Sequence, residues 1–368
     1  MMEAGAIHTM RLDSYRTLGR SGLRVSPLCL GAMTFGGDWG FGCDEITSRG
    51  MLDRYLGSGG NFIDTANIYT RGHAESILGS YFAERGGRDR VVLATKFGGN
   101  LYTGDPNGGG AGRKAMRQQL ENSLRRLRTD YLDLYWLHFE DPFTPMDETM
   151  RALDDLVASG KIRYLGVSDT PAWKVAQAQT EARLRGWTPF VALQIEYSLV
   201  ERSVEHELVP MARELGLGIT PWSPLRGGLL SGKYRRDRLP ETGRHKPGAS
   251  KSLTDRNFTI IEALESVAAE VGTGMARAAI AWLLARPGVT SPILGARTLE
   301  QLEDNLGAFD VVLSAAQMKR LDEASAPVPI FPQSMLANTA PLLQGGTEVE
   351  GRPSAVWPLA PKNDAERW

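Results

Sequence analysis

Short, largely apolar runs alternate along the chain with longer segments in which apolar residues recur every three or four positions. A run such as Val91–Phe97 shows little polar alternation, which is typical of a parallel strand buried on both faces. A segment such as Arg113–Leu127 has the spacing of a helix with one apolar face. The alternation therefore predicts parallel strands that are connected by helices.

Eight such strand–helix pairs follow one another, which predicts an α/β fold of the (β/α)8 or TIM-barrel type with long loops at the C-terminal face. An N-terminal β-hairpin is expected at Tyr15–Val25, before the first pair. The expected strands are Leu28–Gly31, Asn61–Thr65, Val91–Phe97, Tyr131–His138, Ile162–Ser168, Val191–Tyr197, Gly218–Trp222 and Ser291–Leu294. The expected helices are Asp44–Ser58, Ala74–Glu84, Arg113–Leu127, Met146–Ser159, Ala172–Arg185, Val204–Leu215, Asp255–Val271 and Leu299–Leu306.

A doubly wound sheet uses the same alternation and is the main structural alternative. Its dinucleotide-binding fingerprint, G-x-G-x-x-G, does not occur in the sequence, and such a sheet needs only about six strands. We therefore expect one barrel domain over residues 14–325, an N-terminal extension over 1–13 and a C-terminal tail over 326–368.

Composition and charge exclude several classes of function. The 42 basic residues are balanced by 43 acidic ones, so a general nucleic-acid binder is not expected. The two cysteines, Cys29 and Cys43, make neither a disulfide framework nor a zinc site, and no metal is expected. Without a secretory signal or an apolar run of about 18 residues, no membrane partner is expected either. We expect a cytoplasmic protein whose oligomeric state the sequence leaves open.

The glycine content is high, with 41 glycines in 368 residues, and directs attention to the loops. The densest run is Gly98–Gly112, a flexible lid or an irregular loop. A second long loop, Leu225–Leu253, is rich in Lys and Arg, and both a cofactor-clasping role and a solvated surface loop are compatible with it. Gly227–Lys233 spells most of a P-loop, but Tyr234 replaces the magnesium-binding hydroxyl residue, so we interpret this as a chance match.

Ionisable residues stand at the ends of three consecutive strands, where a barrel places its active site. Asp64 and Tyr69 follow the second expected strand, Lys96 lies at the end of the third and His138 at the end of the fourth. A lysine beside a tyrosine favours proton donation from the phenol, and an aspartate would keep that lysine charged. The set suits proton transfer to an oxygen that forms from a carbonyl. No side chain supplies hydride, so a cofactor is required.

These strand-end motifs resemble the aldo-keto reductase superfamily, over roughly residues 15–309. The details are most similar to the aryl-alcohol-dehydrogenase-like branch, which belongs to the same wider group as the potassium-channel β subunits. The motifs that carry the resemblance are Tyr15–Gly19, Gly31–Gly36, Asn61–Tyr69, Ala94–Lys96, Asp130–His138, Gly166–Trp173, Trp222–Leu225 and Gly228–Lys233.

The resemblance implies a reversible, NADP(H)-dependent reduction of aldehydes and ketones. Tyr69 would be the general acid/base, tuned by Lys96, with Asp64 paired to Lys96 and His138 positioning the carbonyl. NADPH would lie extended across the barrel mouth, with Trp222 stacked on the nicotinamide. The residues implied in cofactor binding are Ala32, Met33, Ser168, Asp169, Gln194, Trp222, Ser223, Leu225, Arg226, Gly228, Lys233, Gly295, Arg297, Gln301, Asp304 and Asn305.

Two positions depart from the pattern of the superfamily. Asp169 stands where Asn is commoner, and a carboxylate cannot donate to the carboxamide oxygen. Arg226 stands where a small residue is usual, so it could bind or crowd the pyrophosphate. From their places near strand ends, Phe35, Trp39, Tyr102 and Phe139 are expected to wall an apolar substrate pocket.

Two functions of other classes stay open at this point. One is a redox-sensing regulatory subunit that binds the cofactor but turns over little. The other is a barrel glycoside hydrolase that uses paired carboxylates such as Glu140 and Glu196.

Overall fold

A computed structural model describes residues 10–240 and 250–367 of the chain. Its central feature is a sheet of eight parallel strands in the order β10-β3-β4-β5-β6-β7-β8-β9. The parallel bridge between Ile219 and Val289 connects β9 to the segment that leads into β10, so the sheet closes on itself. The strands are β3 (Cys29–Gly31), β4 (Phe62–Asp64), β5 (Val92–Phe97), β6 (Leu132–Leu137), β7 (Ile162–Ser168), β8 (Phe190–Glu196), β9 (Gly218–Trp222) and β10 (Ile293–Leu294).

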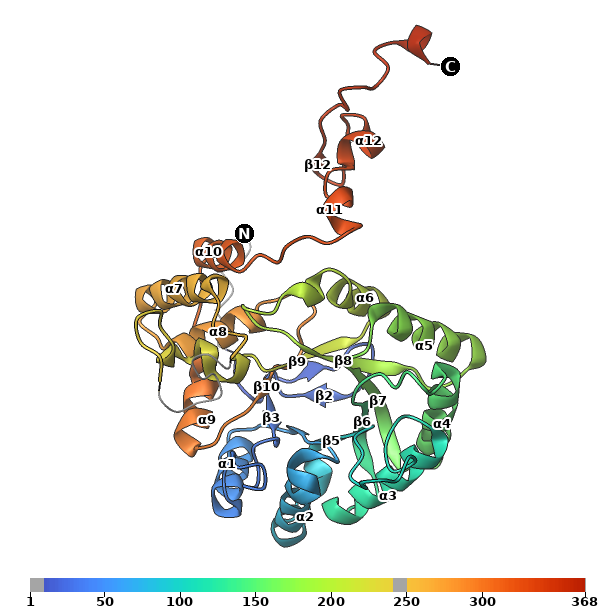
Figure 1. Cartoon of the computed structure of the whole chain (residues 1–368), viewed down its shortest axis with the longest axis vertical. Helices are drawn as coiled ribbons and strands as arrows, with labels where there is room; N and C mark the ends of the chain where they lie inside the picture. Colours follow the sequence, from blue (N-terminus) through green and yellow to red (C-terminus); the bar gives the residue numbers. More distant parts are fainter. Residues whose placement is uncertain (1–9, 241–249, 368) are drawn as a thin grey trace, which may run out of the picture. The chain divides into compact units, whose positions relative to one another are not determined.

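Helices surround this sheet, which confirms the predicted (β/α)8 barrel (Figure 1). Most begin and end within a residue or two of the bounds that the apolar spacing predicts. The helices of this part of the chain are α1 (Glu45–Gly57), α2 (His73–Arg85), α3 (Arg113–Leu127), α4 (Met146–Ala158), α5 (Ala172–Arg185), α6 (Leu208–Leu215), α7 (Asp255–Glu270), α8 (Met275–Leu284), α9 (Leu299–Leu306) and α10 (Ala315–Ala324). Short 3-10 turns precede α2 (Tyr69–Gly72) and α6 (Ser203–Glu205).

Helices α8 and α10 are two elements of the first unit that the sequence pattern did not predict. The connection from β9 to β10 holds two helices, α7 and α8, where one was expected. All residues of α8 except Arg277 are buried. A helix that is apolar on nearly every side has no amphipathic period, and the hydrophobic pattern therefore does not mark it.

The predicted N-terminal hairpin is present as β1 (Arg16–Thr17) paired antiparallel with β2 (Arg24–Val25). Leu18 and Val25 are fully buried and pack with inward-facing strand residues such as Trp136. Gly19 follows with φ 59°, and a Cβ there would lie 2.2 Å from the carbonyl oxygen of Val191. The hairpin thus belongs to the inner core of the barrel, and only glycine allows this close contact.

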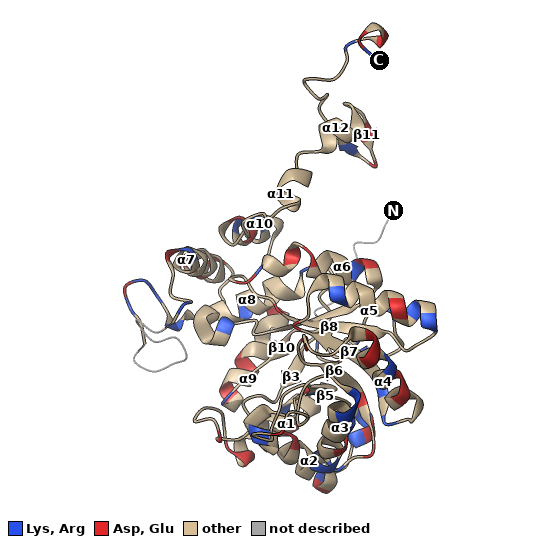
Figure 2. Ribbon diagram, turned by 45° about the vertical axis from the view of Figure 1, so that its right-hand side comes forward, with Lys and Arg blue, Asp and Glu red and all other residues tan. Residues whose placement is uncertain are grey.

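The described chain divides into two compact units between Ala326 and Pro327. The second unit contains the short helices α11 (Gln333–Leu336) and α12 (Ala340–Gln344) and the strand pair β11 (Glu348–Val349) and β12 (Arg352–Pro353). On the outer helices of the first unit, Lys and Arg are interspersed with Asp and Glu (Figure 2). Of the helices described, none is by itself long and apolar enough to cross a membrane. Only α7 and α8 together reach that length, and they are bent by 96°.

Candidate active site

The ends of β4 and β5 bring Asp64 and Tyr69 into contact with Lys96. The Lys96 ammonium donates to the Tyr69 hydroxyl at 3.1 Å and to the carbonyl oxygen of Thr65 at 2.9 Å, and it pairs with Asp64. The Gln194 amide donates to the other Asp64 oxygen at 3.1 Å. The carboxylate is therefore bonded on both oxygens, which fixes the ammonium beneath the phenol.

Tyr69 owes its position to the turn that follows β4. Its backbone N–H donates to the carbonyl oxygen of Ala66 at 3.1 Å, which closes the turn. Thr70 and Arg71 then adopt positive φ values of 45° and 60°, and the Thr70 hydroxyl donates to the carbonyl oxygen of Phe35 at 2.9 Å. Such conformations are strained for residues other than glycine, and the surrounding bonds maintain this one.

Burial and neighbouring charges have opposite effects on the pKa values of Lys96 and Tyr69. Burial by itself lowers the pKa of the Lys96 ammonium, but Asp64 and Tyr69 outweigh it, so that pKa lies above its ordinary value. Burial raises the pKa of Tyr69, and the nearby Lys96 offsets only part of the rise. The expected activation of the phenol by Lys96 is thus present, but in the protein alone it is smaller than the effect of desolvation.

His138 stands next to Tyr69 as a neutral ring. Its ring centroid lies 5.9 Å from that of Tyr69, with the two planes at 80°. Burial first, and then the charge of Lys96, lower the pKa of His138 to about 3. Its Nδ1 atom is buried and has no hydrogen-bond partner. A neutral imidazole beside the phenol can bond a carbonyl oxygen without competing for the proton.

A cavity of about 890 Å³ opens from this cluster and continues to the loops around β10. Such a volume is in the range of small-molecule and cofactor sites. Asp64, Tyr69 and His138 line one end, with Trp39 and Phe139 beside them. The expected cofactor-binding residues that line the cavity are Met33, Asp169, Gln194, Trp222, Ser223, Leu225, Gly228, Lys233, Gly295, Arg297, Gln301, Asp304 and Asn305.

Three expected cofactor-binding residues do not line this cavity. Ala32 and Ser168 are fully buried. Arg226 forms an ion pair with Glu196, which connects the loop after β9 to the end of β8. At this position the cation lies beside a carboxylate of the protein and does not face the cavity.

Two of the four expected substrate-pocket residues also lie elsewhere. Phe35 is fully buried in the core between the sheet and the helices. Tyr102 is exposed on the loop after β5, where its hydroxyl accepts from the Asn122 amide at 2.7 Å. Proximity to a strand end in the sequence does not decide whether a side chain points into the cavity or away from it. The structure places only Trp39 and Phe139 of this group at the cavity wall.

Several cavity residues were missed at the level of the sequence. Ala276 comes from α8, the helix that the apolar pattern did not predict. Most of the others lie within the motifs that carry the family resemblance or in β10 but were not singled out as site residues, and they are Gly31, Thr34, Ile68, Pro224, Ser231, Tyr234, Pro240, Ile293, Leu294 and Ala296.

The basic loop after β9 contributes less charge to the cavity than its composition suggested. Lys233 lines the cavity. Arg235 pairs with Glu265, and Arg236 pairs with Asp255 and Glu262, so both arginines bind carboxylates of α7. The positions 241, 244 and 246 of this loop lie outside the described residues.

The far end of the cavity fits a phosphate-bearing ligand. Gly227 and Gly228 have positive φ values of 61° and 93°, and without side chains they allow a ligand to approach the backbone closely. Lys233 and Arg297 line this end, and within the described part of the chain neither forms an ion pair with a carboxylate. Thr298 caps the N-terminus of α9, a second element that favours anions. The cavity therefore joins a proton-transfer cluster to a cationic, amide-rich end.

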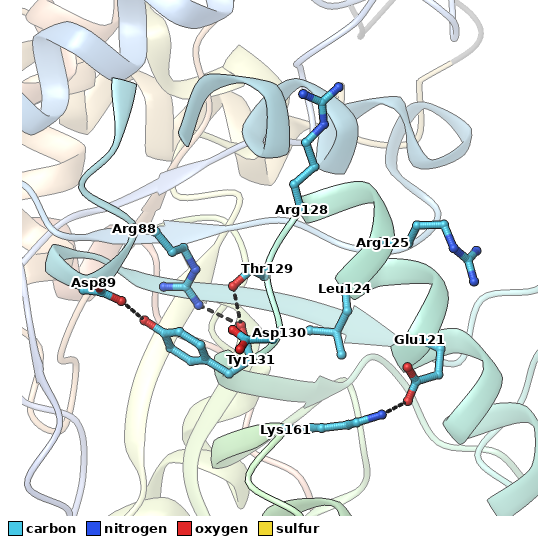
Figure 3. Close-up of a pocket in the computed structure, with 10 residues that line it drawn as sticks. All are labelled: Arg88, Asp89, Glu121, Leu124, Arg125, Arg128, Thr129, Asp130, Tyr131 and Lys161. Atoms are coloured by element: carbon cyan, nitrogen blue, oxygen red, sulfur yellow. Dashed lines mark hydrogen bonds and ion pairs between the residues drawn. The ribbon is translucent and has the colours of Figure 1, made fainter. Parts of the chain in front are cut away.

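A second hollow of about 780 Å³ lies near the C-terminus of α3, on the N-terminal side of the strands (Figure 3). Most of its charged residues bind neighbouring side chains. Lys161 pairs with Glu121, and Arg88 with Asp133, while Arg125 and Arg128 point away from one another. The groups do not converge on a common point, and this face of a barrel serves stability.

The carboxylates considered for sugar hydrolysis are both neutralised. Glu140 pairs with Lys174, and Glu196 pairs with Arg226. Neither lines the cavity. An acid/base pair for hydrolysis needs two carboxyl groups that face a common substrate, so this alternative has no support in the geometry.

Comparison with known proteins decides the family. A sequence model described as the aldo/keto reductase family matches residues 27–326. The chain belongs to the aldo/keto reductase family. It is 41% identical over 321 residues to "Uncharacterized oxidoreductase YrpG" of Bacillus subtilis (strain 168), which covers 84% of this chain and 95% of that protein.

Two fungal relatives carry more specific names. "Aryl-alcohol dehydrogenase [NADP(+)]" of Phanerodontia chrysosporium is 39% identical over 333 residues, covering 85% of this chain and 86% of that protein. "Norsolorinic acid reductase" of Aspergillus flavus is 38% identical over 338 residues, covering 89% and 85%. The family and these relatives make the protein an aldo/keto reductase-type oxidoreductase, similar to aryl-alcohol dehydrogenases.

Proposed function

We propose that this aldo/keto reductase uses NADPH to reduce aldehydes and ketones to alcohols, with Tyr69 as general acid/base. The observation that carries the proposal is the 3.1 Å contact between the Lys96 ammonium and the Tyr69 hydroxyl, since Tyr69 lines the cavity. The same cavity is lined by Lys233 and Arg297, which suit a phosphate. The relative from Phanerodontia chrysosporium that is named for NADP(+) supports this choice of cofactor.

The residues present fit the cofactor at both ends. Trp222 offers an aromatic face near Tyr69, and Gln194 lies at the same end. Gly227 and Gly228 supply the backbone for a pyrophosphate, and Arg297 is placed for a 2′-phosphate, where guanidinium geometry is favourable. When bound there, the nicotinamide ring supplies the hydride that no side chain can provide.

The protein's own residues would manage the proton. Tyr69 gives its hydroxyl proton to the substrate oxygen as the alcohol forms, and it takes that proton back in the reverse reaction. Lys96 stabilises the resulting phenolate from 3.1 Å, and Asp64 holds Lys96 in its charged form. His138 is neutral, so its ring can bond and orient the carbonyl oxygen.

Aromatic carbonyl compounds are the substrate class we propose. The Trp39 ring lies 6.2 Å from that of Tyr69 in an edge-on arrangement, and Phe139 stacks on His138 at 5.0 Å. These rings offer flat apolar surfaces on two sides of the reacting groups. The relatives named for aryl alcohols and norsolorinic acid point to the same class.

The proposal is tested by NADPH oxidation with a panel of aromatic and aliphatic aldehydes, for the wild type and Tyr69→Phe. We expect turnover with aromatic aldehydes and a loss of about 10²–10⁴-fold in Tyr69→Phe, since the general acid is removed. NADPH affinity should be little changed, because the phenol ring stays. Equal rates in the two proteins would refute the role of Tyr69. Tight NADPH binding without turnover of any aldehyde would instead support a regulatory subunit.

A further inference from the structure

Asp169 and Trp222 are joined across the catalytic end of the cavity. The indole Nε1 of Trp222, at the end of β9, donates to Oδ1 of Asp169 at 3.0 Å. Asp169 directly follows β7, and its own N–H donates to the carbonyl oxygen of Gln194 at 3.2 Å. The bond thus links strand ends on either side of β8, and it fixes the edge of the Trp222 ring.

The backbone conformation of Asp169 is unusual for a residue other than glycine, which indicates a functional requirement at this position. Its φ is 41°, in the left-handed region that few non-glycine residues adopt, although Asp tolerates it. The turn directs the carboxylate to the cavity, where Asp169 lines the wall. A strained residue at a ligand site needs a reason in the function of that site.

Asp169 also differs from the nearby carboxylates in its ion pairing. Asp64 pairs with Lys96, and Glu196 pairs with Arg226. Within the described residues Asp169 has no ion-pair partner, and its hydrogen bond from Trp222 comes from a neutral group. Burial raises the pKa of Asp169, while the Trp222 hydrogen bond and the charge of Lys96 oppose that rise. The catalytic end therefore carries one carboxylate without a counter-ion.

We propose that Asp169 is a positioning residue for Trp222 and that its charge makes the site favour the oxidised nicotinamide over the reduced one. The inference rests on the proposed function, since it needs NADP(H) in this cavity. The oxidised ring carries a positive charge and the reduced ring none, while the rest of the cofactor keeps the same formal charges. A carboxylate beside the ring therefore strengthens binding of NADP⁺ relative to NADPH. Because the oxidised form is bound more tightly than the reduced form, transfer of hydride from bound NADPH becomes more favourable than it would be without this charge.

The test compares the dissociation constants of NADP⁺ and NADPH, measured separately by calorimetric titration. Asp169→Asn keeps an oxygen that accepts from the indole but removes the charge. We expect it to weaken NADP⁺ binding about 10-fold relative to NADPH. Asp169→Leu removes both the charge and the hydrogen-bond acceptor for the indole. It should change the ratio of the NADP⁺ and NADPH dissociation constants as much as Asp169→Asn does, and it should weaken the binding of both cofactor forms further. In near-ultraviolet circular dichroism of the free protein, we expect Asp169→Leu to lose signal that Asp169→Asn keeps.

Arg297→Ala serves as the matched control, because Arg297 lies at the opposite end of the cavity. It should weaken both forms by the same factor and leave their ratio unchanged. An unchanged ratio in Asp169→Asn would overturn the role of the charge, and identical dichroism in the Leu and Asn variants would overturn the positioning role. If wild-type protein bound neither form, the proposed function itself would fail, whereas an Arg297→Ala variant that bound both forms as tightly as wild type would refute the phosphate-binding role of Arg297.

Discussion

The Lys96 ammonium lies 3.1 Å from the Tyr69 hydroxyl, and the side chain of Lys96 is completely buried. A charge in such a place costs free energy unless a partner compensates it. Asp64 is that partner, and it is itself held by the Gln194 amide at 3.1 Å. The contact on which the proposed chemistry depends is therefore maintained by a carboxylate that is bonded to Lys96 and Gln194.

Breaking this buried pair should destabilise the protein strongly. Asp64→Ala leaves the Lys96 ammonium buried without a counter-ion, so we expect the free energy of unfolding to fall by about 3–5 kcal/mol. Urea denaturation followed by circular dichroism measures the loss. In Asp64→Ala/Lys96→Met the charge is absent as well, and much of the stability should return. A double variant no more stable than Asp64→Ala would contradict this account.

The low pKa of His138 predicts a specific dependence of stability on pH. The folded ring has a pKa of about 3, against about 6.5 when unfolded. Between these values only the unfolded state takes up the proton. Stability should therefore decrease as the pH falls from about 6.5 towards 3. His138→Gln should show a smaller decrease than the wild type in urea unfolding at a series of pH values. Parallel curves for the two proteins would refute a neutral buried His138.

The carboxylate of Asp322 should hold α10 to the barrel. It accepts from the Trp282 indole at 3.0 Å and from Arg286 at 2.8 Å and 3.0 Å. In Asp322→Ala the Trp282 indole loses its acceptor and Arg286 retains Glu205 and Tyr197 as partners, so we expect a loss of about 1–3 kcal/mol in the free energy of unfolding. Glu323→Gln, on the exposed side of the same helix, is the control and should have little effect. Equal losses in the two variants would contradict a specific role for Asp322.

The strands and most helices could be predicted because each carries a local signal. Buried parallel strands are apolar throughout, and outer helices such as α3 show an apolar stripe. Helix α8 could not be predicted in this way, because nine of its ten residues are buried and only Arg277 breaks the pattern. The clustering of Asp64, Tyr69 and Lys96 could be predicted because parallel strands end at one rim, so residues distant in the sequence meet there.

Contacts that depend on side-chain direction could not be predicted from the sequence. Phe35 and Trp39 stand four positions apart near the end of β3, yet the first is in the core and the second lines the cavity. Arg235 and Arg236 suggested a basic loop that faces a ligand, but α7 supplies carboxylates that bind both. The bond from Trp222 to Asp169 likewise depends on a positive φ that no motif reveals.

Two exposed arginines, one that lines the cavity and one that does not, allow a direct test of cofactor choice. Arg297 lines the cavity without a carboxylate partner among the described residues, whereas Arg235 pairs with Glu265 on α7. A charge-assisted hydrogen bond contributes about 1.5–3 kcal/mol, so Arg297→Met should raise the dissociation constant of NADPH about 10–100-fold. NADH lacks the 2′-phosphate, and its affinity should not change. Arg235→Met removes a similar charge and should leave the affinity for NADPH unaltered. Isothermal titration of both cofactors with both variants gives the four dissociation constants. An equal loss of affinity for NADH and NADPH in Arg297→Met would exclude recognition of the 2′-phosphate by this residue.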